Sequence, residues 1–218
     1  MDTIDEADLK FKHPSSMLLC GSRRTAKTHF VKTLLLKNTI IPNIDWIYWF
    51  SASQQHEIFE ELDTKLGNIS FVKGLPSEDI VDFVHVRAGR KLIVIDDLME
   101  EASKRSDVKH LFTRGRHEDI SVIFLSQNTF HQSKHYLEMS RNTDYYVLFK
   151  NVRDSSIIKT IGSRMGLAKF LSQAYKNATR EPFSYLLMDM RSDTDERIRF
   201  RTKVFDEYSV VYTPKESL

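Results

Sequence analysis

The stretch Gly21-Ser22-Arg23-Arg24-Thr25-Ala26-Lys27-Thr28 decides how the chain folds around it. It comes directly after the apolar run Met17-Leu18-Leu19-Cys20, which is typical of a buried strand. After it, apolar residues recur at the spacing of a helix, at Phe30, Val31, Leu34 and Leu35. This order predicts a strand, a tight loop and a helix. The loop matches the phosphate-binding pattern Gly-x-x-x-x-Gly-Lys-Ser/Thr, except that Ala26 replaces the second glycine.

A loop of this kind binds a polyphosphate. Its backbone N–H groups and the N-terminus of the following helix surround the phosphate oxygens. We expect Lys27 to reach the β and γ phosphates and Thr28 to hold Mg²⁺. The residues expected to contact the nucleotide are Gly21, Ser22, Arg23, Arg24, Thr25, Ala26, Lys27 and Thr28. For Arg23 and Arg24 the sequence leaves several destinations open: phosphate, a base, a neighbouring subunit, or solvent at the tip of the loop.

Ala26 is the one departure from the loop pattern. The second glycine normally lets the backbone pass close to the β-phosphate. If Ala26 keeps helical φ and ψ, the alanine costs nothing in conformation. The cost is then only that of a methyl group against a phosphate, and a misplacement of about an ångström slows turnover roughly 10²-fold. Ala26 therefore concerns the rate of an enzyme more than the identity of its ligand.

Size and composition set broad limits. With 218 residues, 41% of them hydrophobic, the chain can form a core of its own. Basic and acidic residues number 32 and 30, so any basic surface must be local. The single cysteine, Cys20, lies in an apolar run and is expected to be a small buried hydrophobe. No signal-peptide pattern is present at the start, and no apolar run approaches the ~20 residues that cross a bilayer. We therefore expect an intracellular protein with no membrane partner.

Strand and helix patterns alternate along the chain. Apolar runs predict strands at residues 17–20, 46–50, 92–95, 121–125, 145–149 and 183–188, with a weaker one at 69–72. Helical patterns lie at residues 29–37, 56–66, 77–86, 103–114, 155–161 and 167–176. The alternation predicts an α/β fold with a mostly parallel sheet flanked by helices on both faces. We expect one domain over residues 1–218, with a core at about 14–190. Residues 191–218 would form a C-terminal extension or an edge hairpin, its strands drawn from 198–205.

A second motif is Lys91-Leu92-Ile93-Val94-Ile95-Asp96-Asp97. A buried strand that ends in paired carboxylates is what a Mg²⁺–nucleotide site needs at the rim of a parallel sheet. We expect Asp96 to hold the metal, usually through water, and Asp97 to act as the general base. The alternative interpretation is a strand that ends in a solvated acidic turn. The presence of the phosphate loop favours the metal site.

The run from Ile120 to Leu125 is followed by Ser126-Gln127-Asn128. An amide at the tip of a strand beside the phosphate strand can orient the attacking water or contact the γ-phosphate. Gln127 is the preferred residue for this role. The alternative is a simple chain reversal, since these residue types also favour turns.

Arginines just before the later strands form the last group of candidates. Arg114 and Arg116 precede the strand at 121–125, and Arg141 precedes the strand at 145–149. A guanidinium offered to the γ-phosphate of a neighbouring subunit completes the site of a ring ATPase. We prefer Arg141 for this role, with Arg116 second. The alternative is that each arginine only complements the dipole at a helix C-terminus.

Together these motifs resemble those of the viral DNA-packaging ATPases of the FtsK–HerA superfamily. The closer likeness is to the packaging ATPases of poxviruses and other large DNA viruses, virophages and Polinton-type elements. The residues that carry the resemblance lie at 19–28, 93–97, 112–117, 121–128 and 145–154. The likeness covers residues 14 to 190, and the order and spacing of the motifs make it specific. Residues 191–218 carry no motif of the family.

The resemblance implies a RecA-like P-loop core that binds ATP and Mg²⁺. In this sequence Lys27 and Thr28 would bind them, Asp96 and Asp97 would be the metal and catalytic acids, and Gln127 the sensor. A downstream arginine would act in trans within a homo-oligomeric ring. Such a ring pumps double-stranded DNA into a preformed viral capsid, at a portal or other vertex. The protein would then work inside a host cell, where virions assemble.

Two other functions stay open from the sequence. One is a non-motor P-loop kinase, which would need an acceptor pocket and usually an arginine-rich lid. The other is a catalytically weakened nucleotide-binding scaffold, which Ala26 favours and the retained Lys27, Thr28, Asp96 and Asp97 oppose. The leading expectation is an ATPase that translocates double-stranded DNA.

Overall fold

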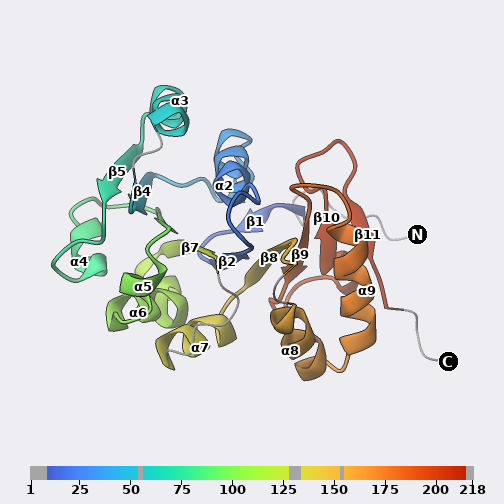
Figure 1. The fold of residues 1–218 in the computed structure, drawn as a ribbon. Helices are drawn as coiled ribbons and strands as arrows, with labels where there is room; N and C mark the ends of the chain where they lie inside the picture. Colours follow the sequence, from blue (N-terminus) through green and yellow to red (C-terminus); the bar gives the residue numbers. More distant parts are fainter. Residues whose placement is uncertain (1–8, 54–55, 128–133, 153–154, 215–218) are drawn as a thin grey trace.

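The fold is built on one large sheet, seen in Figure 1. The computed structural model describes residues 9–53, 56–127, 134–152 and 155–214. Within these ranges the sheet has nine strands, in the order β11 (Val210–Tyr212), β10 (Phe200–Thr202), β9 (Tyr185–Asp189), β8 (Tyr145–Phe149), β2 (Ser16–Cys20), β7 (Ile120–Ser126), β6 (Lys91–Asp96), β4 (Trp46–Ser51) and β5 (Ile69–Lys73). The strands from β8 to β5 are parallel to one another, and β9, β10 and β11 continue the sheet in antiparallel pairing.

Helices cover both faces of the sheet (Figure 1). The first face carries α2 (Lys27–Leu36) and α3 (His56–Leu66). The second carries α4 (Ile80–Val84), α5 (Met99–Ala102), α6 (Ser106–Arg114), α7 (Lys134–Arg141), α8 (Ser156–Arg164) and α9 (Ala168–Ala178). Short elements complete the described chain: β1 (Phe11–Lys12), β3 (Ile40–Ile41) and the 3₁₀ helices η1 (Gly115–Glu118) and η2 (Glu196–Ile198).

The core lies in two layers, one on each side of the sheet. Because side chains alternate along a strand, Met17 and Leu19 of β2 face the layer under α2 and α3, and Leu18 and Cys20 face the other layer. Both faces of the central strands are buried, which explains their continuous apolar runs. The predicted fold class, a mostly parallel α/β sheet with helices on both faces, is confirmed. Cys20 is buried and unpaired, as the sequence predicted.

Element boundaries differ from the sequence patterns where polar or strained residues intervene. The helix expected over 77–86 is shorter because Asp79 caps it: its side chain accepts a hydrogen bond from the N–H of Val81 at 2.9 Å. The helix expected over 103–114 starts at Ser106 because Arg105 is extended. The strand expected from residue 183 starts two residues later, after Phe183 at a φ of 63°. The sequence patterns missed α5, α7, β1 and β3.

The C-terminal part of the chain lies at the edge of the sheet beside β8. There β10 and β11 pair as an antiparallel hairpin, and β11 lies beyond the range in which hairpin strands were expected. Among the helices described, none is both long and apolar enough to cross a membrane. The assignment of residues 1–218 to one domain stays a prediction.

The turn between α8 and α9 is packed backbone to backbone at Gly162. A Cβ built on Gly162 would lie 2.8 Å from the Cα of Ala168, closer than side-chain carbons approach backbone atoms. The N–H of Leu167 also donates a hydrogen bond to the carbonyl of Gly162 at 2.8 Å, which fixes this approach. Glycine is therefore required by close packing and not by its backbone conformation.

We predict that Gly162→Ala lowers the free energy of unfolding by about 1–3 kcal/mol, because the added methyl group overpacks the α8–α9 contact. Chemical denaturation followed by circular dichroism measures this change. Helix propensity alone would give the opposite sign, a gain of about 1 kcal/mol. Ser163→Ala, at the exposed neighbouring position, is the control and should change stability by less than about 0.5 kcal/mol. A stabilised Gly162→Ala protein would contradict the packing argument.

Candidate active site

Three motifs meet at the carboxyl edge of the parallel strands. The phosphate loop follows β2, Asp96 ends β6, and Gln127 follows β7, which lies between them. They surround a cleft of about 420 Å³. The residues that line it are Arg23, Arg24, Ala26, Lys27, Thr28, His29, Ile58, Asp96, Asp97, Leu125 and Gln127. The structure therefore brings the predicted loop, acidic and amide residues together in one place. His29 and Ile58 were not predicted; His29 directly follows Thr28, whereas nothing in the sequence singled out Ile58.

The backbone of the loop is shaped to receive an anion. Arg24 and Ala26 both have left-handed backbone conformations, with φ of 60° and 66°. Alternation of this kind turns successive N–H groups toward one point and forms an anion-binding concavity. Ala26 is also the N-cap of α2 and offers no side-chain cap, so the N–H groups of the first helical turn stay available to a ligand.

Gly21 and Thr25 fix the entrance of the loop. A Cβ on Gly21 would lie 2.7 Å from the Cβ of Phe149 and 2.7 Å from Oγ1 of Thr25, so no side chain fits at Gly21. The Thr25 hydroxyl donates a hydrogen bond to the carbonyl of Ser22 at 2.8 Å. These contacts hold the loop against β8 in the conformation described above.

Lys27 is folded back over the loop. Its Nζ donates hydrogen bonds to the carbonyl oxygens of Gly21 at 2.8 Å and Ser22 at 2.9 Å. Burial lowers the pKa of Lys27, and the carboxylates of Asp96 and Asp97 act in the opposite direction. The ammonium group thus lies within the loop, where a polyphosphate would compete with the two carbonyl oxygens.

Asp96 and Thr28 form the buried end of the cleft. The Thr28 hydroxyl donates a hydrogen bond to Oδ2 of Asp96 at 3.0 Å. Asp96 is only 7% exposed, and burial raises its pKa to about 6, an effect to which the charge of Asp97 adds and which Thr28 and Lys27 oppose. A cation beside the buried carboxylate of Asp96 would stabilise its charged form.

A chain of side-chain contacts joins the acidic pair to the tip of the loop. Gln127 donates a hydrogen bond from Nε2 to Oδ1 of Asp97, and its Oε1 accepts one from Nε of Arg23 at 3.1 Å. Asp97 itself has a left-handed backbone, with φ of 57°, which turns its carboxylate away from the buried strand to the exposed rim. Gln127 was not among the destinations that the sequence left open for Arg23, and which of them Arg23 serves stays a prediction.

The sequence model described as "Poxvirus A32 protein" matches residues 3–169, more than half of the chain. The chain belongs to the poxvirus A32 protein family. A comparison with curated protein sequences gives no significant match.

Solved structures extend the comparison to the whole fold of this A32-family protein. The genome packaging NTPase B204 of Sulfolobus turreted icosahedral virus 2, in complex with ATP-gammaS, superposes with a TM-score of 0.57 at 13% identity, covering 96% of this chain and 99% of that chain. The B204 DNA-packaging ATPase of Sulfolobus turreted icosahedral virus gives a TM-score of 0.54 at 14% identity, covering 92% and 97%. At these identities the likeness establishes the fold. With its family membership and phosphate loop, the A32-family chain is a P-loop ATPase of the viral DNA-packaging group with a RecA-like core.

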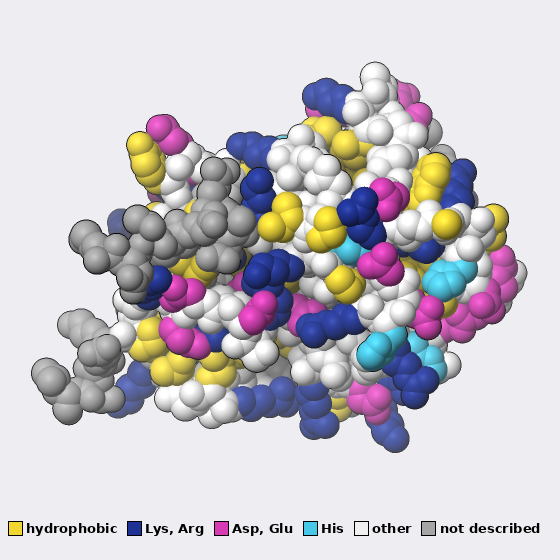
Figure 2. Space-filling view, turned by 180° about the vertical axis from the view of Figure 1, so that it is seen from behind, with side chains coloured by type: hydrophobic (Ala, Val, Ile, Leu, Met, Phe, Trp, Pro, Cys, Tyr) yellow, Lys and Arg dark blue, Asp and Glu magenta, His cyan; other side chains and the backbone are white. Residues whose placement is uncertain are grey.

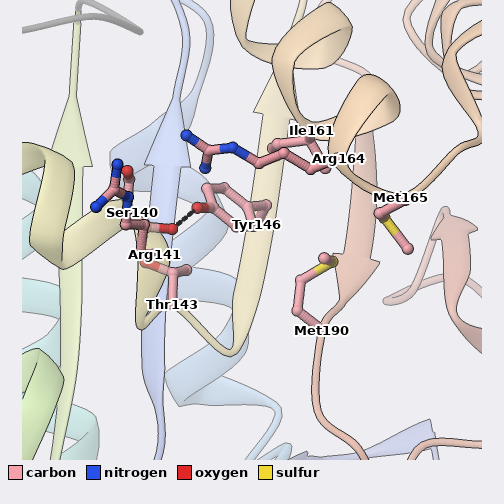
Figure 3. A pocket seen from close by; sticks show the side chains of 8 residues that line it. All are labelled: Ser140, Arg141, Thr143, Tyr146, Ile161, Arg164, Met165 and Met190. Atoms are coloured by element: carbon pink, nitrogen blue, oxygen red, sulfur yellow. Dashed lines mark hydrogen bonds between the residues drawn. The ribbon is translucent and has the colours of Figure 1, made fainter.

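The two predicted arginines lie away from this cleft. Arg141 ends α7 and Arg116 lies in η1; both precede the start of a strand, so they lie at the amino edge of the sheet. Arg116 forms an ion pair with Asp144, whose other carboxylate oxygen accepts a hydrogen bond from the N–H of Ser16 at 2.8 Å. Arg141 instead lines a pocket of about 450 Å³ together with Arg164 (Figure 3). Neither arginine belongs to the cleft of its own chain.

The conformation of Ala26 corrects one expectation. A helical φ and ψ at this position would cost nothing, but Ala26 has φ of 66° and ψ of 25°. The left-handed conformation is needed because the chain must reverse direction between the loop and the first turn of α2. It costs an alanine about 1 kcal/mol or more relative to glycine. Ala26 in this A32-family loop is therefore a strained residue.

We predict that Ala26→Gly raises the free energy of unfolding by about 1 kcal/mol, because glycine adopts the left-handed conformation without strain. Chemical denaturation measures it. The matched control is Ala168→Gly, at an exposed position in the first turn of α9, which should lower stability by up to about 1 kcal/mol. Equal losses in the two variants would show that Ala26 is not strained.

Proposed function

We propose that this A32-family ATPase hydrolyses ATP with Mg²⁺ to drive double-stranded DNA into a viral capsid. The observation that supports it most is the meeting of the phosphate loop, the acidic pair and Gln127 in one cleft. Membership of the poxvirus A32 protein family supports a role in packaging viral DNA. The same role gives the proposed place of action, a virion assembly site inside an infected cell.

The residues at the buried end of the cleft fit Mg²⁺. Thr28 and Asp96 present a hydroxyl and a carboxylate oxygen 3.0 Å apart, and Mg²⁺ prefers hard oxygen ligands. We assign both residues to the metal. A bound Mg²⁺ would neutralise charge on the β and γ phosphate oxygens.

Asp97, Gln127 and Lys27 each have a separate role in the proposed hydrolysis. Asp97, exposed at the rim, accepts the proton of the attacking water. Gln127 orients that water, and its contacts with Asp97 and Arg23 hold its amide in place. Lys27 leaves the loop carbonyls for the phosphate oxygens, where a charge-assisted hydrogen bond is stronger than one to a neutral acceptor.

The placement of Arg141 supports a homo-oligomeric ring. In the part of the chain that the structure describes, neither Arg141 nor its neighbour Arg164 forms an ion pair, and both line a pocket at the amino edge (Figure 3). A guanidinium at that edge serves a nucleotide only if the nucleotide is held by another subunit. Arg116 is less suited to act in trans because it already forms an ion pair with Asp144. We therefore assign Arg141 the role of the arginine acting in trans.

The surface charge is in keeping with local DNA contacts. On the face shown in Figure 2, Lys and Arg side chains are interspersed with Asp and Glu. The formal net charge is only +2, so the chain as a whole does not attract DNA strongly. DNA binding by this protein would then depend on the ring, which repeats a weak local site around its axis.

We predict that double-stranded DNA stimulates ATP hydrolysis by the wild-type protein. Asp97→Asn should bind ATP within a fewfold of wild type and lose hydrolysis by at least about 10²-fold, the scale on which general-base catalysis contributes. Lys27→Ala should weaken ATP binding itself. Phosphate release and nucleotide binding are measured in parallel. ATP binding without turnover, with or without DNA, would favour the scaffold alternative, and phosphorylation of a nucleoside without DNA would favour the kinase.

We predict that mixing Arg141→Ala with Asp97→Asn subunits restores part of the ATPase activity that each variant lacks alone. The Arg141→Ala subunit keeps Asp97, and the Asp97→Asn subunit keeps Arg141. Where the two meet in the right order, one complete active site is formed. Activity is measured across mixing ratios, with each variant mixed with itself as the control. No recovery at any ratio would place Arg141 in a structural role.

A further inference from the structure

A second pocket lies beside the phosphate loop, on the far side from the acidic pair. It has a volume of about 250 Å³ and shares Ala26 and His29 with the nucleotide cleft. Its other walls come from α2, the end of β8, and β9 and β10 with the segments that flank them, including Phe30, Phe183 and Phe205. Most of these walls lie beyond residue 169, outside the region that matches the family.

This pocket lies in the direction in which the nucleoside of a bound nucleotide would extend from the loop. The γ-phosphate end must face Asp96, Asp97 and Gln127, which lie on the β6 and β7 side of β2. The nucleoside must therefore leave the loop on the other side of β2, toward β8 and β9. Ala26 and His29 lie on that route, and the 250 Å³ pocket is where it leads.

The floor of the pocket is a packed aromatic layer. The ring of Phe30 meets Tyr185 edge to face at 4.9 Å and Phe205 at 4.8 Å between centroids. The Tyr185 hydroxyl accepts a hydrogen bond from the N–H of Val204 at 3.2 Å, which holds the turn after β10 in place. A preformed apolar floor with a few polar groups at its rim is the usual form of a small-molecule site.

The rim of the pocket is strained and carries an exposed aromatic ring. Phe183 is 65% exposed, and both it and Lys203 have left-handed backbones, with φ of 63° and 57°. Non-glycine residues in this conformation are concentrated at ligand sites. Asp206, in the same turn as Lys203, adds an exposed carboxylate to the rim. None of these features is needed to bury the core.

We propose that this pocket holds the base of the bound nucleoside triphosphate, with Phe183 stacking on the base. The carboxylate of Asp206 accepts a hydrogen bond from an exocyclic amino group, which favours adenine over a base with a carbonyl at that position. The assignment rests on the proposed nucleotide binding at the loop. It gives residues 183–206 a role in choosing the nucleotide.

The test compares two probes, one with a nucleoside attached to a triphosphate-like chain and one that is a triphosphate chain alone. The dissociation constants of the non-hydrolysable analogue AMPPCP and of inorganic tripolyphosphate are measured by calorimetry. Phe183→Ala should weaken AMPPCP binding about tenfold, as loss of one base–aromatic stack does, and leave tripolyphosphate binding unchanged. Phe183→Trp should bind AMPPCP like wild type. Tyr208→Ala, at an aromatic residue 76% exposed outside the pocket, is the matched control and should change neither.

Selectivity for the base tests Asp206. ATP and inosine triphosphate differ in the amino group at position 6, and Asp206→Ala should reduce the preference for ATP at least threefold while tripolyphosphate binding stays the same.

The outcomes distinguish failure of the base pocket from failure of nucleotide binding at the loop. Unchanged AMPPCP binding by Phe183→Ala, or equal weakening of AMPPCP and tripolyphosphate, would overturn the base pocket while nucleotide binding at the loop stands. A wild-type protein that binds neither probe would overturn both assignments.

Discussion

Parallel pairing of β7 between β2 and β6 is the constraint on which the site depends. Cys20 pairs with Ser126, and Asp96 pairs with Leu125, so the three strands end at nearly the same level. The N–H of Gly21 donates to the carbonyl of Ser126 at 3.2 Å and carries the pairing one residue into the loop. The loop, the acidic pair and Gln127 are therefore placed by backbone hydrogen bonds, and the apolar layers on both sides of the sheet keep that register.

Much of this architecture could be predicted because it is encoded locally. A buried parallel strand needs a continuous apolar run, and each central strand has one that ends in a polar or small residue. The loop pattern, Asp96, Asp97 and Gln127 all follow such runs directly, so their common edge follows from the topology of a parallel sheet. The roles assigned to these side chains are supported by the geometry and stay proposals.

The features that could not be predicted from the sequence depend on contacts between distant segments. The left-handed backbone of Ala26 is imposed by the path of the loop and has no signature in an alanine. The contact of Arg23 with Gln127 joins residues far apart in the sequence. The helix α7 was missed because its periodic pattern is short. Arg153 and Asp154, part of the segment that carried the family resemblance, lie outside the described ranges.

The hydrogen bonds of Lys27 to the loop carbonyls bear on how the enzyme empties its site. In the role proposed for Lys27, its ammonium would exchange two carbonyl partners for phosphate oxygens when phosphates enter, so the net gain in affinity would be smaller than its charge alone would give. When the phosphates leave, the carbonyl oxygens of Gly21 and Ser22 would accept the hydrogen bonds of the ammonium again, and no buried cation would be left without partners. Product release would then cost less than the separation of an ion pair in a closed site. A loop of this kind would favour repeated exchange of nucleotide over tight retention, which is what the proposed ATP-driven translocase needs at each step.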